Sequence, residues 1–139
     1  MKMENNIFLA TWNVRGTYEE GLINELTNQL KRYKIDIIAL QETKQKGNEV
    51  YDINGYTFFK SGGKDRKLGT GFMVSNKLTT AVTQFTPISD RICCLRLKGK
   101  YQKISLINIH APTAEKEIDD KERFYEVLDN IYEKSPDTI

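Results

Sequence analysis

Short apolar runs and helical spacing alternate along the first forty residues of the chain. The run Ile7–Thr11 is followed by Asn13 and a glycine, which predicts a buried strand that breaks into a loop. Apolar residues then recur along one face of a helix: Leu22, Ile23, Leu26, Leu30 and Tyr33. This helix is predicted from about Tyr18 to Tyr33, opened by a capping box of Thr17 and Glu20.

The rest of the chain is mainly strand-like. The run Ile35–Leu40 after the first helix completes a strand–helix–strand unit, whose usual form is a right-handed parallel crossover. Further strand-like segments with turn-rich connectors follow: Tyr56–Lys60, Gly71–Ser75, Ala81–Phe85, Ile92–Leu97 and Ile104–Ile109. A final helix is predicted from about Asp119 to Lys134, and Asp137–Ile139 begins another strand. The apolar face of that helix consists of Phe124, Val127, Leu128 and Ile131.

Length and composition indicate one globular domain over residues 1–139. Twenty-one Lys and Arg against nineteen Asp and Glu give a net charge of only +2, so bulk charge does not argue for a nucleic-acid partner. Cys93 and Cys94 are adjacent in an apolar run and are expected to be reduced packing residues. No apolar stretch is long enough to span a bilayer, and the expectation is an intracellular protein without a membrane partner.

Three predicted strands end in polar residues that could carry chemistry: Asn13, Glu42 and His110. Ligands of open α/β sheets bind beyond the carboxyl ends of strands, so the three side chains could share one site. Glu42 is a hard oxygen ligand for Mg²⁺ or Mn²⁺, and Asn13 could hold a phosphate oxygen or a metal-bound water. His110 could donate to a phosphate oxygen or move a proton. Taken singly, each residue has the simpler interpretation of an ordinary strand-end or turn residue.

The motifs around these residues resemble the endonuclease/exonuclease/phosphatase superfamily. Four segments have the order and approximate spacing found there: Thr11–Gly16, Leu40–Lys44, Gly69–Ser75 and Asn108–Thr113. The most similar branch contains LINE-type retrotransposon endonuclease domains, craniofacial-development-protein-like sequences and abasic-site endonucleases. The resemblance covers nearly the whole chain. It implies an α/β fold, the amino-terminal portion of a DNase-I-like two-sheet sandwich with helices on the outer faces.

The same resemblance implies a divalent-metal-dependent phosphodiester hydrolase, an endonuclease acting on DNA. Glu42 would be the principal ligand of Mg²⁺ (or Mn²⁺), Asn13 would contact metal or phosphate, and His110 would donate to the scissile phosphate. His110 stands where abasic-site and LINE enzymes usually have Tyr, whereas deoxyribonuclease-like relatives have His. The family's later Gly-Asp-Phe-Asn and Ser-Asp-His motifs are absent, and His110 is the only histidine. We therefore expect a domain truncated at its carboxyl end and inactive as it stands.

Alternative interpretations remain open at this point. The chain could be a non-catalytic remnant or binding module of the same fold, or a phosphoesterase acting on a substrate other than nucleic acid. The basic side chains Lys64, Arg66 and Lys67 could contact a nucleic-acid backbone or belong to an ordinary solvated loop. Trp12 and Tyr56 could stack on bases, although core positions are the commoner place for such aromatics.

Two further expectations concern partners and location. If the strands form one sheet of a sandwich, its uncovered apolar face is expected to drive self-association or binding to another chain. DNA is the expected partner of the full-length form, and a nuclear location would follow from a DNA substrate.

Overall fold

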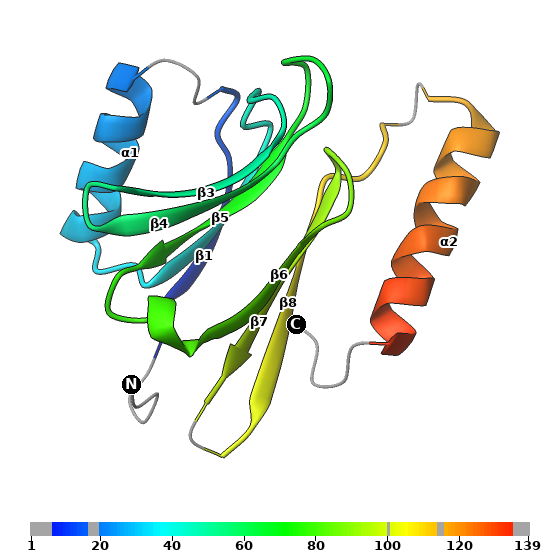
Figure 1. Ribbon diagram of the computed structural model, residues 1–139. Helices are drawn as coiled ribbons and strands as arrows, with labels where there is room; N and C mark the ends of the chain where they lie inside the picture. Colours follow the sequence, from blue (N-terminus) through cyan, green and yellow to red (C-terminus); the bar gives the residue numbers. More distant parts are fainter. Residues whose placement is uncertain (1–6, 17–19, 100, 114–115, 135–139) are drawn as a thin grey trace.

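A computed structural model of the chain describes residues 7–16, 20–99, 101–113 and 116–134 (Figure 1). The elements follow in the order β1 (Leu9–Asn13), α1 (Glu20–Arg32), β2 (Ile37–Gln41), β3 (Asn48–Ile53), β4 (Tyr56–Ser61), β5 (Thr70–Ser75), a 3-10 turn (Thr79–Ala81), β6 (Val82–Pro87), β7 (Ile92–Lys98), β8 (Lys103–Ile109) and α2 (Ile118–Lys134). The predicted cap at Thr17 and the predicted strand Asp137–Ile139 lie outside the described residues.

The strands form two sheets that face each other. One sheet has the order β1-β2-β5-β4-β3 and the other the order β6-β7-β8. Figure 1 shows α1 on the outer face of the first sheet and α2 beyond the second. This is the predicted α/β sandwich with outer helices. The condition that all the strands form one sheet, on which the expected uncovered face depended, is not met, because this stretch of chain contributes strands to both sheets.

The core between the sheets is built from apolar side chains of both layers. Ile37, Phe59, Phe72 and Val74 from the first sheet pack against Cys93, Leu95, Leu97 and Leu106 from the second. Each inner strand presents alternate residues to this layer, as a pleated strand must. The two sheets therefore cover much of each other's inner face, and the uncovered apolar surface is smaller than a single exposed sheet would leave.

Helix α1 covers the outer face of the first sheet through a narrower stripe than predicted. Ile23, Leu26 and Leu30 are buried in a second cluster with side chains of β2, β4 and β5. Leu22 and Tyr33 are 47% and 65% exposed, so their placement on the buried face was wrong. At about 100° per residue, Leu22 and Tyr33 lie together at one margin of the apolar arc, and only the part of the arc that carries Ile23, Leu26 and Leu30 faces the sheet.

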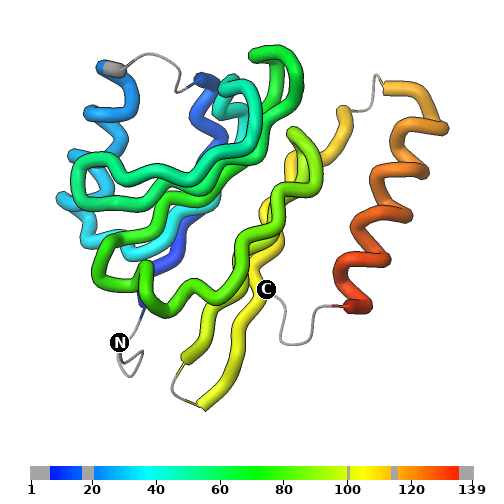
Figure 2. Tube along the Cα trace, viewed as in Figure 1, coloured from blue at the N-terminus to red at the C-terminus, as the bar shows by residue number. Residues whose placement is uncertain are grey.

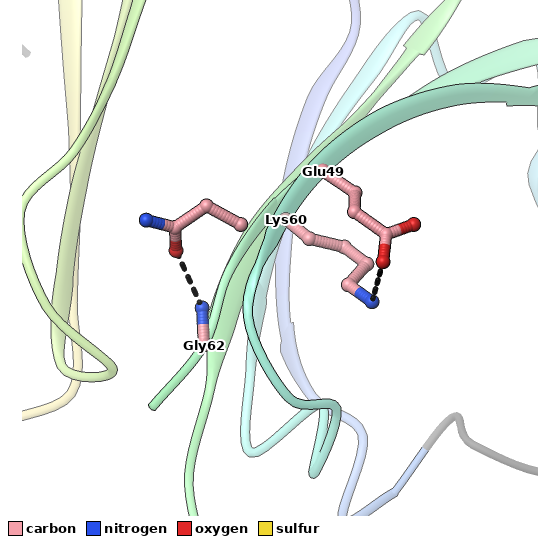
Figure 3. Close-up of polar contacts among 4 residues, drawn as sticks. Glu49, Lys60 and Gly62 are labelled. Carbon is pink, nitrogen blue, oxygen red and sulfur yellow. Dashed lines mark hydrogen bonds and ion pairs between the residues drawn. The ribbon is translucent and has the colours of Figure 1, made fainter. Parts of the chain in front are cut away.

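Strand β3 was not predicted from the sequence. It pairs antiparallel with β4 across the turn Asn54-Gly55, whose φ angles of 51° and 88° suit the two-residue hairpin that Asn-Gly favours. Its end is fixed by Asn48, whose Oδ1 accepts a hydrogen bond from Gly62 N at 3.2 Å. Figure 3 shows this contact and the 3.8 Å ion pair of Lys60 with Glu49. Lys60 is buried, so its charge is compensated by a carboxylate on the neighbouring strand.

The opposite edge of the sandwich is open. Phe8, Leu9 and Trp12 are 55%, 47% and 52% exposed. The expectation of a core position is therefore wrong for Trp12, whereas Tyr56 is buried at 4% exposure. Between β1 and β8 lies a cleft of about 380 Å³ with a largely apolar lining that includes Leu9, Ala39, Phe72, Leu106 and Ile109.

Two smaller expectations were also tested. Cys93 is buried, Cys94 is half-buried, and both are free thiols, as predicted. On α2, Phe124 is buried and Leu128 and Ile131 are half-buried, but Val127 is exposed and was wrongly placed on the packed face. Within the described residues, no helix combines the length and apolarity needed to cross a membrane.

Candidate active site

The parallel pair β1–β2 brings Asn13 and Glu42 to the same end of the sheet. Asn13 is in register with Gln41, the residue immediately before Glu42. The Asn13 Nδ2 donates a hydrogen bond to Glu42 Oε2, although the two residues are 29 positions apart. Asn13 is exposed and Glu42 is half-buried. One carboxylate oxygen is thus held by Asn13, and the half-buried side chain remains accessible to a ligand.

Glu42 adopts a left-handed backbone conformation that its neighbours hold in place. Its φ angle is 55°, and Arg15 and Lys44 have φ angles of 55° and 56°. Gly16 N donates to Glu42 O at 2.7 Å, and Val14 N donates to Gln41 O at 3.0 Å. Such conformations cost about 1–3 kcal/mol for each non-glycine residue and cluster at functional sites. The loop after β1 therefore holds the Glu42 backbone in an uncommon conformation.

Gly69 supports the same turn from the other side. Its carbonyl accepts from Thr43 N at 3.1 Å, and its own N donates to Asp90 O at 3.1 Å. Its φ angle is 121°, and a Cβ added here would lie 2.3 Å from Thr43 Oγ1. Only glycine fits this close approach, because any larger residue would push Thr43 and the Glu42 turn outward.

His110 follows β8 and is anchored through its backbone. His110 N donates to Arg91 O at 2.8 Å, and Arg91 Nη1 donates to His110 O at 3.0 Å. The side chain is half-buried, and its buried Nδ1 has no hydrogen-bond partner among the residues that the structure describes. Buried polar atoms of this kind normally have a partner in protein, water or ligand. Figure 1 shows β1 and β8 ending at the same end of the molecule.

Asn108 belongs to the site although it was not among the predicted functional residues. It is 2% exposed and donates from Nδ2 to Leu40 O at 2.9 Å and to Gly71 O at 2.7 Å. Its Oδ1 accepts a hydrogen bond from Gln41 Nε2 at 2.7 Å. The available signal was an amide inside the apolar run Leu106-Ile-Asn-Ile109, where a buried polar group must have partners.

The basic loop between β4 and β5 lies next to the Glu42 turn. Lys64, Arg66 and Lys67 are exposed, and Lys67 N donates to Asp65 Oδ1 at 3.1 Å. The loop ends at Leu68, whose carbonyl accepts from Lys44 N at 2.8 Å. Figure 2 shows this loop at the end of the molecule where β1 also ends. The predicted basic residues and the predicted carboxylate therefore share one end of the fold.

The donor set fits a hard divalent cation only in part. Glu42 supplies carboxylate oxygens, and Asn13, with its Nδ2 turned toward Glu42, retains its amide oxygen as an acceptor. In the part of the chain that the structure describes, no group of three or more His, Cys, Asp or Glu is placed to hold a metal. Mg²⁺ requires six oxygen ligands and often retains several waters, so one carboxylate and one amide can form the protein side of a weak site.

Comparison with known proteins agrees with the motifs. The model of the Endonuclease/Exonuclease/phosphatase family matches residues 10–138. Craniofacial development protein 2 of Bos taurus is 28% identical over 129 residues, which is 92% of this chain. The fold is similar to an AP endonuclease from Leishmania major (TM-score 0.64, 21% identity, 86% of this chain). It is also similar to the endonuclease domain of TRAS1, a telomere-specific non-LTR retrotransposon (TM-score 0.56, 18% identity, 91% of this chain).

The chain is shorter than each of these proteins. It spans 22% of the length of the craniofacial protein, 44% of the Leishmania chain and 54% of the TRAS1 domain. The motifs, the two-sheet fold and the family match nevertheless agree over nearly all of its residues, and they support a function of the phosphodiesterase or nuclease type. The chain belongs to the Endonuclease/Exonuclease/phosphatase family.

Proposed function

We propose that this chain carries the metal- and phosphate-binding part of a divalent-metal-dependent endonuclease acting on DNA. The observation that carries the proposal is the Asn13–Glu42 contact at the shared end of β1 and β2. A nuclease needs an accessible carboxylate where a phosphate can approach, and Glu42 meets this requirement.

Each side chain has a proposed role in hydrolysis. Water attacks phosphorus, the bond to the leaving oxygen breaks, and that oxygen takes up a proton. Mg²⁺ or Mn²⁺ bound at Glu42 and Asn13 would supply charge stabilisation on the phosphate oxygens. His110, which is half-buried, donates from its imidazole to a non-bridging phosphate oxygen. The Asp and His that activate the water belong to the family motifs that these 139 residues lack.

DNA as the substrate is supported by local rather than total charge. Lys64, Arg66 and Lys67 extend from the loop beside the Glu42 turn, and such side chains neutralise phosphates without reading sequence. The named structural relatives are endonucleases, one of them from a telomere-specific element. A DNA substrate would place the protein inside the cell, in the nucleus where there is one.

The metal proposal is tested by titrating Mg²⁺ and Mn²⁺ into the wild-type chain and Glu42→Gln by calorimetry. We expect weak binding by the wild type and loss of most of it in the variant, because the amide removes the charged ligand. Glu126→Gln is the matched control, since Glu126 is an exposed carboxylate on α2. Equal affinity in wild type and Glu42→Gln would remove Glu42 from the site.

The same chain is expected not to nick plasmid or abasic duplex DNA above background. Catalytic groups that act as a unit fail together when some are absent. A Mg²⁺-dependent nicking rate that Glu42→Gln abolishes would contradict this expectation and would make the present residues sufficient for activity.

Two alternatives keep the fold but change the function. A non-catalytic binding module would bind duplex DNA with an affinity that Glu42→Gln leaves unchanged, whereas substitution of the three basic loop residues would lower it. A phosphoesterase for another substrate would show no DNA binding and would hydrolyse a small phosphodiester once the domain is complete. The basic loop beside Glu42 favours the nucleic-acid interpretation.

We also propose self-association through the open edge between β1 and β8. Leu9 lines the apolar cleft, Phe8 and Trp12 are further exposed apolar side chains at the same edge, and exposed apolar surface commonly marks an interaction site. Light scattering should show a concentration-dependent mass that falls in Trp12→Ser, while Tyr132→Ser, an exposed aromatic of α2, leaves it unchanged. A wild-type monomer at all concentrations would contradict the proposal.

A further inference from the structure

We propose that Asn108 is a positioning residue that sets the place of His110 relative to Glu42. The hydrogen bonds of Asn108 to Leu40, Gly71 and Gln41 form what we call the cross-sheet bridge. The inference rests on the proposed function, since it concerns two side chains of that site. It assigns the placement to a residue that touches neither metal nor phosphate in the proposed mechanism.

The cross-sheet bridge uses both donor hydrogens and the acceptor oxygen of one side-chain amide. Both hydrogens of Nδ2 are engaged, by Leu40 O on β2 and by Gly71 O on β5. The Oδ1 accepts from Gln41 Nε2, and Gln41 in turn contacts Thr11 Oγ1 on β1 at 3.0 Å. One side chain of β8 is thus connected to three strands of the opposite sheet. Aspartate would lose the donors, and an apolar residue would lose all three bonds.

The hydrogen bonds of the cross-sheet bridge are directional, unlike the apolar packing around them. The remaining contacts between the sheets are mainly side chains such as Phe72, Leu95 and Leu106, whose burial is favourable but non-directional. Hydrogen bonds weaken steeply when misaligned, so the cross-sheet bridge resists sliding of β8 along β2. Buried polar networks of this kind, when fully satisfied, specify a unique arrangement of the core.

The positions of its members connect the cross-sheet bridge to the chemistry. Asn108 is two residues before His110, and Gln41 is immediately before Glu42. A strand rises about 3.3 Å per residue and is stiff over two residues, so a shift at Asn108 is passed on to His110. Misplacement of a reacting group by about 1 Å can cost about a hundredfold in rate. The cross-sheet bridge therefore joins the two sheets next to Glu42 and His110, whose relative position matters for the chemistry.

The test uses the single histidine of the chain as a probe. The imidazole of His110 gives one set of resonances, and Mn²⁺ bound at Glu42 broadens them by an amount that falls steeply with distance. We compare the wild type with Asn108→Ala and with Gln41→Met, which removes the amide at nearly constant length. Thr27→Val is the control: Thr27 is fully buried and hydrogen-bonded within α1, on the outer side of the first sheet.

We expect Asn108→Ala and Gln41→Met to keep Mn²⁺ affinity but to change the broadening of the His110 signals by about twofold or more, a displacement near 1 Å being the relevant scale. Thr27→Val should lower stability without changing the broadening. Equal broadening in the wild type and both variants overturns the proposal. If Asn108→Ala does not fold, Gln41→Met decides, because Gln41 is only half-buried.

Failure of the metal site is distinguishable from failure of the cross-sheet bridge. If Mn²⁺ does not bind the wild type, the proposed metal role of Glu42 is wrong. The spectrum of the His110 imidazole without metal then decides whether Asn108 positions His110. A shift of the His110 resonances in both variants, but not in Thr27→Val, supports the positioning role. An unchanged spectrum in the variants overturns it.

Discussion

Strands β1 and β5 belong to the same sheet and both carry large apolar residues, yet their surroundings differ. Every residue of β5 is buried, whereas four of the five residues of β1 are exposed. The cause is their place in the sheet: β5 lies between β2 and β4, while β1 pairs only with β2. Strand β5 also faces the second sheet through Phe72 and Val74 and α1 through Met73. Neighbours, not composition, decide which apolar residues become core.

The residues that stabilise the fold and the residues of the candidate site lie in different parts of the sheets. Most of the residues that close the core lie on β4, β5 and β7, whereas Asn13 lies on the edge strand β1 and His110 follows the edge strand β8. Segments with few buried contacts open most easily, and ligand-binding elements are often of this kind. The open edge is therefore where substitutions should change binding more than folding.

The largest expected effect on stability follows from a loss of packing in the core between the two sheets. Phe72→Ala should lower the free energy of unfolding by about 3–5 kcal/mol, because Phe72 is 1% exposed and lies between the sheets. Phe8→Ala at the open edge should cost less than about 1 kcal/mol, because that side chain is already half in water. Urea unfolding of both variants measures the contrast. Similar losses would mean that the edge is as well packed as the centre.

A smaller effect on stability is expected at Gly69, which packs against the turn that carries Glu42. Gly69→Ala should cost about 2 kcal/mol or more, since it forces a side chain into a left-handed conformation against Thr43. It should also weaken metal binding at Glu42 by displacing the turn.

Gly21→Ala in α1 is the matched control for Gly69→Ala. Nothing lies within 4 Å of an added Cβ at Gly21, and alanine favours a helix, so a gain of about 0.5 kcal/mol is expected. Urea unfolding and calorimetry measure the two substitutions together. A Gly69→Ala variant with wild-type metal affinity would show that the turn does not need this glycine.

The smallest expected effect is a pH dependence of stability that arises from the two cysteine thiols. Burial raises the pKa of Cys93 to about 12 and that of Cys94 to about 11, from an ordinary value of 9.0. The folded state therefore favours the neutral thiols. Their contribution is complete below pH 9 and is lost as pH rises through the folded values, by up to about 1.4 kcal/mol per pH unit for each thiol. Urea unfolding from pH 8 to 11 should show this decline.

Replacing both cysteines by alanine supplies the control for the pH series. The variant should be less stable throughout but should lose less stability between pH 9 and 11 than the wild type. The same slope in both proteins would assign the decline to tyrosines and lysines instead.

The sequence contained most of the fold because most strands are continuous apolar runs. Ile92–Leu97 and Ile104–Ile109 were predicted within one residue of β7 and β8. Strand β3 was missed because Asn48-Glu-Val-Tyr-Asp-Ile53 is half polar, as an edge strand can be. The two-sheet sandwich was expected from the resemblance, but which strand belongs to which sheet was not predicted, since pairing joins residues far apart in the sequence and leaves no local pattern.

The part of the candidate site that lies at the ends of strands could be predicted from the sequence. Asn13 and Glu42 were placed together because parallel strands carry their carboxyl ends to one edge, and the structure joins them. His110 was placed at its strand end, but its anchor Arg91 gave no signal. Asn108 looked like one polar residue in a strand, because nothing in the sequence indicates that two carbonyls of the opposite sheet would meet it.

The Asn54-Gly55 turn has a consequence for the order of folding. Its two residues close β3 onto β4 locally, and hairpins of this kind form in about 1–10 μs. The hydrogen bonds of Asn108 to Leu40 and Gly71 instead join residues 68 and 37 positions apart. During synthesis the hairpin can therefore form before β8 has been made. Contacts between distant segments also form slowly because loop closure must come first, so the candidate site should be among the last parts of the chain to assemble.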